Sequence, residues 1–198
     1  QYTKSIRHLF HNDGALVANI RWNPTYLLLQ GVADLHERQD FLGLGQILAA
    51  MGKKAASVGN TAEAEYRYRQ ALQVFHDNDA REAEAGILCT LGELEISAQR
   101  FGAAEYCYAC SQRIYRKLRN RLGEAIALYG RGIVADAQAY LEDAVEYYRK
   151  ALAIFTRQGK RDQSYEVRCR LDAVQERIQK RKAQNAFSEV VVIPGRRK

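Results

Sequence analysis

Proline is nearly absent from this sequence, which favours long uninterrupted helices. The two prolines, Pro24 and Pro194, lie outside residues 45–184, and a proline inside a helix would cost roughly 3 kcal/mol. Long apolar runs are also missing. Nothing approaches the roughly 18 consecutive apolar residues of a membrane-spanning helix, and the N-terminus has no apolar signal-peptide core. We therefore expect no membrane span and a cytoplasmic location.

Residues typical of catalytic and metal sites are sparse as well. Four cysteines without a signal peptide are most simply reduced thiols. Cys107 and Cys110 form a Cys-x-x-Cys pair, but a zinc site would need a second pair and a redox motif would need an α/β context. His8 and His11 have ligand spacing on a helix but no further ligands nearby. With no glycine-rich phosphate loop and no Gly-x-Ser-x-Gly elbow, the sequence predicts no enzyme, no metal and no cofactor.

The excess of positive charge is concentrated at the C-terminal end. Residues 170–198 hold eight basic and three acidic residues, so they carry +5 of the net charge of +7. The candidate basic residues of this end are Arg177, Lys180, Arg181, Lys182, Arg196, Arg197 and Lys198. Their concentration makes nucleic acid or another anionic surface an alternative ligand, whose binding would depend steeply on salt.

What the sequence does contain is a repeat with a period of 40 residues over its last two-thirds. Six positions agree in type across three copies. The columns are Leu48, Leu88 and Leu128; Gly52, Gly92 and Gly132; Ala64, Ala104 and Ala144; Tyr68, Tyr108 and Tyr148; Ala71, Ser111 and Ala151; and Phe75, Tyr115 and Phe155. A unit of this kind cannot bury its apolar face alone, so the copies are expected to stack.

The apolar spacing within each copy predicts two helices joined by a short turn. Tyr68, Ala71, Leu72 and Phe75 stand at i, i+3, i+4 and i+7, which is one face of a helix. Because a glycine in a helix costs about 1 kcal/mol relative to alanine, the glycine column indicates that two helices approach closely there. We expect the tyrosine column to lie in the core rather than to form a stacking platform for nucleic acid.

The turns carry the expected signals for helix ends. Gly59 suits a left-handed C-terminal cap, and Asn60 with Glu63 predicts a capping box. Asp79 with Glu82 predicts the same box before the next helix, and Gly159 closes the third unit.

These columns resemble the tetratricopeptide repeat family. The resemblance is carried by Leu91-Gly92, Ala104, Tyr108 and Ser111, and by Gly132, Ala144, Tyr148 and Ala151. The usual period is 34 residues, so the period of 40 resembles the subclass of Pins/LGN-type and kinesin-light-chain-type repeats. Arg131 departs from the family's leucine, and no proline closes a unit. The resemblance implies an all-α fold, an α-solenoid of stacked antiparallel helix pairs in a right-handed superhelix.

The repeat divides the chain into six segments. Residues 1–44 form a helical N-terminal cap or a degenerate repeat, in which Asn23-Pro24 predicts a helix start. The three repeats occupy 45–84, 85–124 and 125–164. A capping helix follows at 165–184, within a helical pattern over 161–184, and a basic tail at 185–198 contains the β-like run Val190-Val191-Val192-Ile193.

The resemblance also implies a concave groove lined by the first helix of each unit. The positions carried over as partner-binding are Gln46, Lys53, Ser57, Cys89, Glu93, Ser97, Tyr129, Ile133, Asp136 and Glu166. Tyr129, Cys89 and Ile133 would be apolar anchors, and Lys53, Glu93 and Asp136 would set the register of the bound segment. The family's carboxylate clamp is missing, because its positions hold Ala49, Thr90, Ile126 and Gly130. The asparagine ladder is also missing, because its column holds Lys53, Glu93 and Ile133.

The favoured hypothesis is a non-enzymatic scaffold or adaptor that binds a peptide segment of another protein in this groove. The alternatives are binding of nucleic acid or an anionic surface through the basic end, and self-association through the apolar tail at 188–194.

Overall fold

The structure, a computed structural model, describes residues 41–191, with side chains to residue 185. Seven α-helices and no strand occur in this part of the chain, so the prediction of an all-α repeat solenoid is confirmed. The helices are α4 (Phe41–Ser57), α5 (Thr61–Asp77), α6 (Arg81–Ser97), α7 (Phe101–Lys117), α8 (Arg121–Ala137), α9 (Leu141–Arg157) and α10 (Arg161–Val191). The predicted cap at 1–44 and its helix start at Asn23-Pro24 fall almost wholly outside the described residues.

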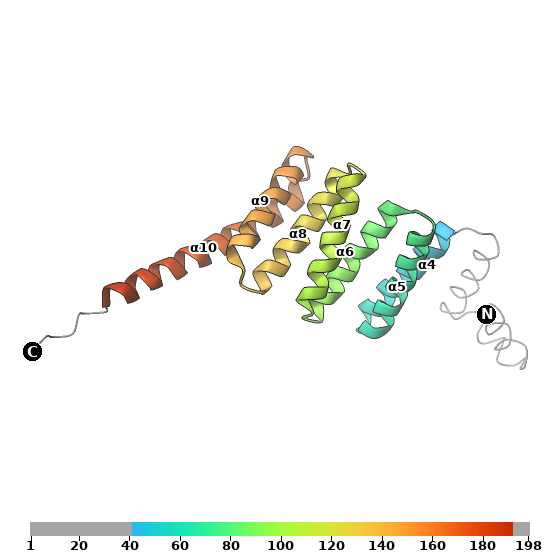
Figure 1. Ribbon diagram of the computed structural model, residues 1–198, viewed down its shortest axis with the longest axis horizontal. Helices are drawn as coiled ribbons and strands as arrows, with labels where there is room; N and C mark the ends of the chain where they lie inside the picture. Colours follow the sequence, from blue (N-terminus) through green and yellow to red (C-terminus); the bar gives the residue numbers. More distant parts are fainter. Residues whose placement is uncertain (1–40, 192–198) are drawn as a thin grey trace, which may run out of the picture. The chain divides into compact units, whose positions relative to one another are not determined.

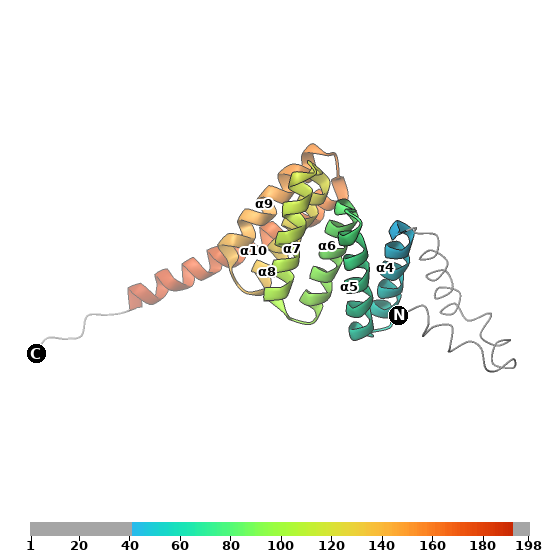
Figure 2. The same cartoon turned by 45° about the vertical axis from the view of Figure 1, so that its right-hand side comes forward.

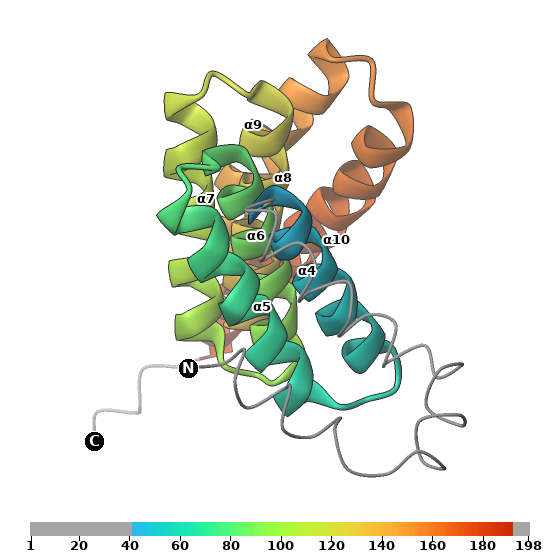
Figure 3. The same ribbon diagram turned by 90° about the vertical axis from the view of Figure 1, so that its right-hand side faces the viewer.

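The chain divides into two compact units, residues 1–87 and 88–198. In the first unit α4 packs against α5, a pair that can be followed in Figure 3. In the second unit α8 packs against both α7 and α9, and α9 packs against α10 (Figures 1 and 2). The helix pairs begin at Phe41, Arg81 and Arg121, and the predicted repeat boundaries stay predictions.

Helix α10 is longer than the sequence pattern indicated. It runs to Val191 rather than ending near residue 184, so Val190 and Val191 are helical and not extended. No proline or glycine interrupts the chain between Arg161 and Pro194, and the β preference of two valines is too weak a signal to end a helix. The rest of the tail, residues 192–198, lies outside the described part of the chain.

Tyrosine rings of one helix pack against glycines of the preceding helix, which is the close approach that the glycine column predicts. A Cβ atom placed on Gly52 would lie 2.7 Å from Tyr68 Cδ1 in the first unit. In the second unit, a Cβ on Gly92 would lie 2.7 Å from Tyr108 Cε2, and one on Gly132 would lie 2.5 Å from Tyr148 Cδ1. The three tyrosines are at most 3% exposed, which confirms that this column belongs to the core.

Every turn between the described helices places one residue in the left-handed region. Gly59 and Gly159 do so, as predicted, with φ of 79° and 68°. At each turn the following amide donates to the carbonyl five residues back, for example Tyr140 N to Ala135 O at 2.8 Å, the signature of a Schellman cap. The non-glycine residues in this conformation are Asp79, Gln99, Arg119 and Ala139.

These turns correct one prediction and refine another. Asp79 does not cap α6, because it occupies the left-handed position, and its carboxylate instead accepts from Arg81 Nε at 2.7 Å. Asn60 does cap α5, accepting from the Glu63 amide at 3.1 Å. The Glu63 carboxylate, however, accepts from Arg67 Nε at 2.7 Å.

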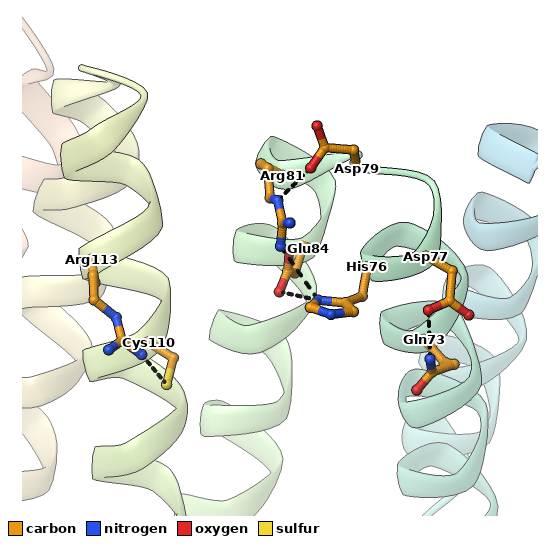
Figure 4. Close-up of polar contacts among 8 residues, drawn as sticks. All are labelled: Gln73, His76, Asp77, Asp79, Arg81, Glu84, Cys110 and Arg113. Carbon is orange, nitrogen blue, oxygen red and sulfur yellow. Dashed lines mark hydrogen bonds and ion pairs between the residues drawn. The ribbon is translucent and has the colours of Figure 1, made fainter.

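A buried glutamate recurs at the corner between one repeat and the next. In the first unit Glu84 accepts from Arg81 Nη1 at 2.9 Å and lies 3.1 Å from His76 Nδ1 (Figure 4). Forty residues on, in the second unit, Glu124 accepts from Arg116 Nε at 2.9 Å and from Arg121 Nη1 at 3.0 Å. Both glutamates are under 10% exposed, so the arginines compensate carboxylates that would otherwise be costly to bury.

Substituting Gly132 by alanine should destabilise the second unit. The added methyl group has no room beside Tyr148, and overpacking of this kind costs about 1–3 kcal/mol. This cost exceeds the stabilisation that alanine gives a helix relative to glycine. Gly102→Ala is the matched control, because nothing lies within 4 Å of a Cβ there. Thermal unfolding should show a lower midpoint for Gly132→Ala only; equal midpoints would contradict the close approach.

Substituting Ala139 by glycine should stabilise the second unit. Ala139 has φ of 62°, a conformation that costs an L-residue about 1–2 kcal/mol and costs glycine almost nothing. Allowing for the greater entropy of glycine in the unfolded chain, we expect a gain of about 1 kcal/mol in unfolding free energy. Ala153→Gly, at an exposed site within α9, should lower the unfolding free energy by about 1 kcal/mol. Chemical denaturation of both variants and the wild type measures these changes. A loss for both variants would contradict the assignment of the cap.

Candidate functional site

Three of the predicted groove residues meet at one pocket in the second unit. Glu93 from α6, with Tyr129 and Ile133 from α8, lines an open pocket of about 200 Å³. The other residues of its lining are Ile96, Tyr108, Ile126 and Gly130. We call this the α6–α8 pocket, and its lining is apolar or aromatic apart from Glu93.

The pocket arises from one helical face and one missing side chain. Ile126, Tyr129, Gly130 and Ile133 stand at i, i+3, i+4 and i+7 of α8, so they share a face. Gly130 leaves the space that the Tyr108 ring of α7 fills, and Tyr108 is only 2% exposed. Tyr108 thus forms a buried floor, while Ile126, at 41% exposed, stands at the open side.

Tyr129 is held in place from α9 and α10. Its hydroxyl donates to Glu166 of α10, and its ring centroid lies 5.9 Å from that of Tyr148. The Arg170 guanidinium lies 5.7 Å from the Tyr129 ring centroid. Burial, with the hydrogen bond to Glu166, raises the pKa of Tyr129, so the ring presents a neutral surface. Glu166, predicted as a groove contact, therefore acts on the pocket by orienting Tyr129.

Glu93 is the single charged group of the pocket lining. No ion pair or side-chain hydrogen bond involves its carboxylate within the described residues. Glu93 is an exposed residue, and the partial desolvation of its carboxylate beside the pocket raises its pKa above the ordinary value. Its titratable neighbours are neutral at pH 7, because burial raises the pKa of Tyr108 and raises that of Cys89 to about 11.

Cys89, predicted as an apolar anchor of the groove, is buried in a contact with α7. Its side chain is 7% exposed, and its sulfur lies 3.0 Å from Ser111 Oγ of α7. The thiol therefore helps to pack α6 against α7. Cys89 lies one turn before Glu93 on α6, on a part of the helix in contact with α7, and its binding role stays a prediction.

The remaining predicted groove residues do not gather at the pocket. Asp136 pairs with Arg177 of α10, and the exposed Ser97 donates to the Glu93 carbonyl at 3.1 Å. In the first unit, the exposed residues predicted for the groove are Gln46, Lys53 and Ser57. The partner-binding role of these five residues stays a prediction.

The described basic residues of the C-terminal end are largely neutralised by carboxylates. Arg177 pairs with Asp136, and Arg181 Nη2 lies 2.7 Å from Glu142 Oε1. Lys180 Nζ lies 2.7 Å from Glu176 Oε1, and Lys182 is exposed. Arg196, Arg197 and Lys198 lie outside the described residues. The described part of this end is thus less positive than its count of basic residues indicated.

A second pocket of about 350 Å³ lies where α9 meets α10. Ser164 stands there in the position that Glu84 and Glu124 hold in the earlier corners, so this corner lacks the buried carboxylate. The residues that line this second pocket are Thr156, Gly159, Arg161, Ser164, Tyr165 and Arg168.

The cysteine pair of α7 has no metal-binding surroundings. Within the described residues neither Cys107 nor Cys110 forms a disulfide, both are partly buried, and Arg113 Nη2 lies 3.4 Å from Cys110 Sγ (Figure 4). Within the described residues, no three His, Cys, Asp or Glu side chains are grouped as metal ligands. In the same part of the chain, no helix combines the length and apolar character needed to cross a membrane.

Sequence reasoning missed Tyr108 and Gly130 as parts of the pocket. Tyr108 belongs to a core column, so its repeat position gave no sign of a second role. Gly130 did carry a signal, because its column holds Ala50 and Thr90 in the other units. A glycine at one copy of a position marks a local change in packing.

Replacing Glu93 by glutamine should stabilise the protein at neutral pH. Because the folded-state pKa of Glu93 is raised, its ionised form is disfavoured by folding, and this cost appears as pH rises through that pKa. The gain in melting temperature should therefore be present at pH 7 and shrink toward pH 4.

Glu146→Gln is a control of opposite sign. The ammonium group of Lys150 lowers the pKa of Glu146, so this variant should lose stability at pH 7 and converge with the wild type as pH falls. Equal pH profiles for the two variants would contradict the environment assigned to Glu93.

The comparisons with known proteins agree with this architecture. The family model for tetratricopeptide repeats matches residues 83–157, which fall within α6 to α9. No curated protein matches the sequence.

Among solved structures, the chain resembles aspartyl phosphate phosphatase F from Bacillus subtilis, with a TM-score of 0.55 and 13% identity over 78% of this chain and 50% of that one. It also resembles BtubC (BKLC) from P. vanneervenii, with a TM-score of 0.53 and 16% identity over 98% of this chain and 91% of that one. The chain thus spans half the length of the phosphatase, and identities this low show the fold alone. Residues 83–157 thus match the tetratricopeptide repeat family, and the repeated helix pairs and glycine–tyrosine contacts of the described residues agree with that match.

Proposed function

We propose that this protein is a non-enzymatic interaction scaffold that binds a segment of a partner protein at the α6–α8 pocket. The pocket is lined from α6 and α8, which the repeat pattern predicts as the first helices of their units, and by Tyr108 of α7. Stacked repeats form extended binding surfaces. The observation that carries the proposal is an open apolar pocket that contains an oriented tyrosine and one carboxylate.

The composition of the pocket suits a peptide better than a flat protein surface. A central aromatic residue with aliphatic neighbours is the usual form of an energetic hot spot. Tyr129 is fixed by Glu166 and Tyr148 before any ligand arrives, so binding would not have to order it. Ile126 and Ile133 flank it along α8, which gives room for consecutive side chains of a bound segment.

The basic end is the weaker candidate surface. Arg177, Lys180 and Arg181 each have a carboxylate partner within the second unit. A ligand phosphate would therefore have to compete with these carboxylates. Self-association through residues 188–194 stays a separate hypothesis.

A photo-crosslinking residue placed at position 126 should capture a partner protein. Ile126 is exposed at the open side of the pocket, so a benzoylphenylalanine there would contact a bound segment. The same residue at position 153, an exposed site on α9, is the matched control. We expect a crosslinked band from cell extract at position 126 only, and the band should weaken about tenfold in an Ile133→Ser background, because that variant loses a pocket contact. Equal yields at the two positions would contradict the proposal.

A further inference from the structure

We propose that the α6–α8 pocket selects a segment in which one lysine or arginine is flanked by apolar side chains, with the cation bound at Glu93. This inference rests on the proposed function and adds the chemistry of the partner to it. It follows from the juxtaposition of a carboxylate that has no cation with an apolar pocket that is open to ligand.

The first step concerns the charge at Glu93. The buried glutamates Glu84, Glu95 and Glu124 each pair with at least one arginine, whereas Glu93 is exposed. Glu93 has no such partner within the described residues, although it lies among the side chains of Ile96, Ile133 and Tyr129. A cation from outside could form a charge-assisted hydrogen bond with the Glu93 carboxylate beside this apolar surface.

The second step concerns the shape of the ligand side chain. Lysine and arginine carry an apolar stem of several methylene groups that ends in a charged head. Ile126 and Ile133 can contact such a stem while the head reaches the carboxylate. A cation without a long apolar stem would leave the isoleucine side chains uncovered. An uncharged aliphatic side chain would bury the Glu93 carboxylate further without neutralising its charge.

The third step concerns the number of cations. The chain carries a net charge of +7, so a strongly basic segment would be repelled at long range, although salt limits this repulsion to about 8 Å under physiological conditions. A single cation within an apolar segment gains the local contact with Glu93 and meets little of that repulsion. Arg170, the nearest described cation to Tyr129, lies 3.9 Å from Glu166 and is thus already compensated.

The test uses the full chain and capped heptapeptides of sequence Gly-Leu-Ala-X-Ala-Leu-Gly labelled with fluorescein. At X the peptides carry lysine, norleucine or glutamate. Norleucine keeps the aliphatic stem and lacks the charge, so the lysine–norleucine difference isolates the contribution of the cation. Fluorescence anisotropy gives each affinity.

The wild type should bind the lysine peptide about tenfold tighter than the norleucine peptide, as expected for one charge-assisted hydrogen bond. Glu93→Gln should abolish this preference, and Glu93→Lys should transfer it to the glutamate peptide. Glu146→Gln removes a carboxylate elsewhere in the second unit and should leave the preference unchanged. Binding of the lysine peptide should also weaken as salt increases.

Acid should weaken binding of the lysine peptide by protonating Glu93. Since burial raises the pKa of Glu93, the loss should begin at a higher pH than for an ordinary glutamate. Burial raises the pKa of Cys89, Tyr108 and Tyr129, so these groups stay protonated in this range. Glu166 and Arg170, which contact Tyr129, are further charged groups beside the pocket, and the same titration of Glu93→Gln separates their effect from that of Glu93.

Two results would overturn the inference. One is equal affinity of the wild type for the lysine and norleucine peptides, including failure of both to bind. The other is a lysine preference that survives in Glu93→Gln. If crosslinking at position 126 succeeds while either result is found, the proposed function stands and the assignment of the cation fails. If crosslinking also fails, both fail.

Discussion

The contact between a glycine of one helix and the tyrosine ring of the next is the constraint on which the described fold depends. It brings α4 close to α5 through Gly52 and Tyr68, and it recurs in the second unit at Gly132 and Tyr148. Because the ring occupies the space that a Cβ atom would take, each repeat must keep both residues together. A fixed register between the paired helices follows from the same demand, since a shifted helix would bring a larger side chain against the ring.

The turns maintain that register along the chain. The six helices α4 to α9 each have 17 residues, and each is followed by a turn with one left-handed residue. The Schellman hydrogen bond satisfies carbonyls at the helix end, so the turn needs little from its side chains. This explains why Asp79 and Arg119 can occupy the left-handed position that Gly59 and Gly159 occupy at other turns. Backbone hydrogen bonding here outweighs the local preference of the side chain.

The sequence predicts the features that all repeats share. It predicts few of the features that belong to one repeat alone. The helix pairs, the buried tyrosines and the close approach at the glycines all follow from columns that agree across three copies. The buried position of Cys89 and the roles of Tyr108 and Gly130 do not follow, because they depend on which neighbouring helix covers each face of α6 and α8. The corner glutamates were also missed. Glu84 and Glu124 are 40 residues apart, but an isolated glutamate in a sequence is expected at the surface until its arginines are placed around it.

The α6–α8 pocket shows how a repeat that is built for stacking can gain a binding site. Gly130 is present in one copy only, and with it the ring of Tyr108 acts in two contacts, against Gly92 and against Gly130. A larger residue at position 130 would push that ring outward into the pocket, so the floor depends on the same contact that stabilises the fold. Glu93 lies beside this floor with a raised pKa, which means that folding alone would favour a neutral side chain there. A ligand cation at Glu93 would stabilise its ionised form, and Tyr129, fixed through Glu166, supplies the rigid apolar wall beside which that ligand would lie.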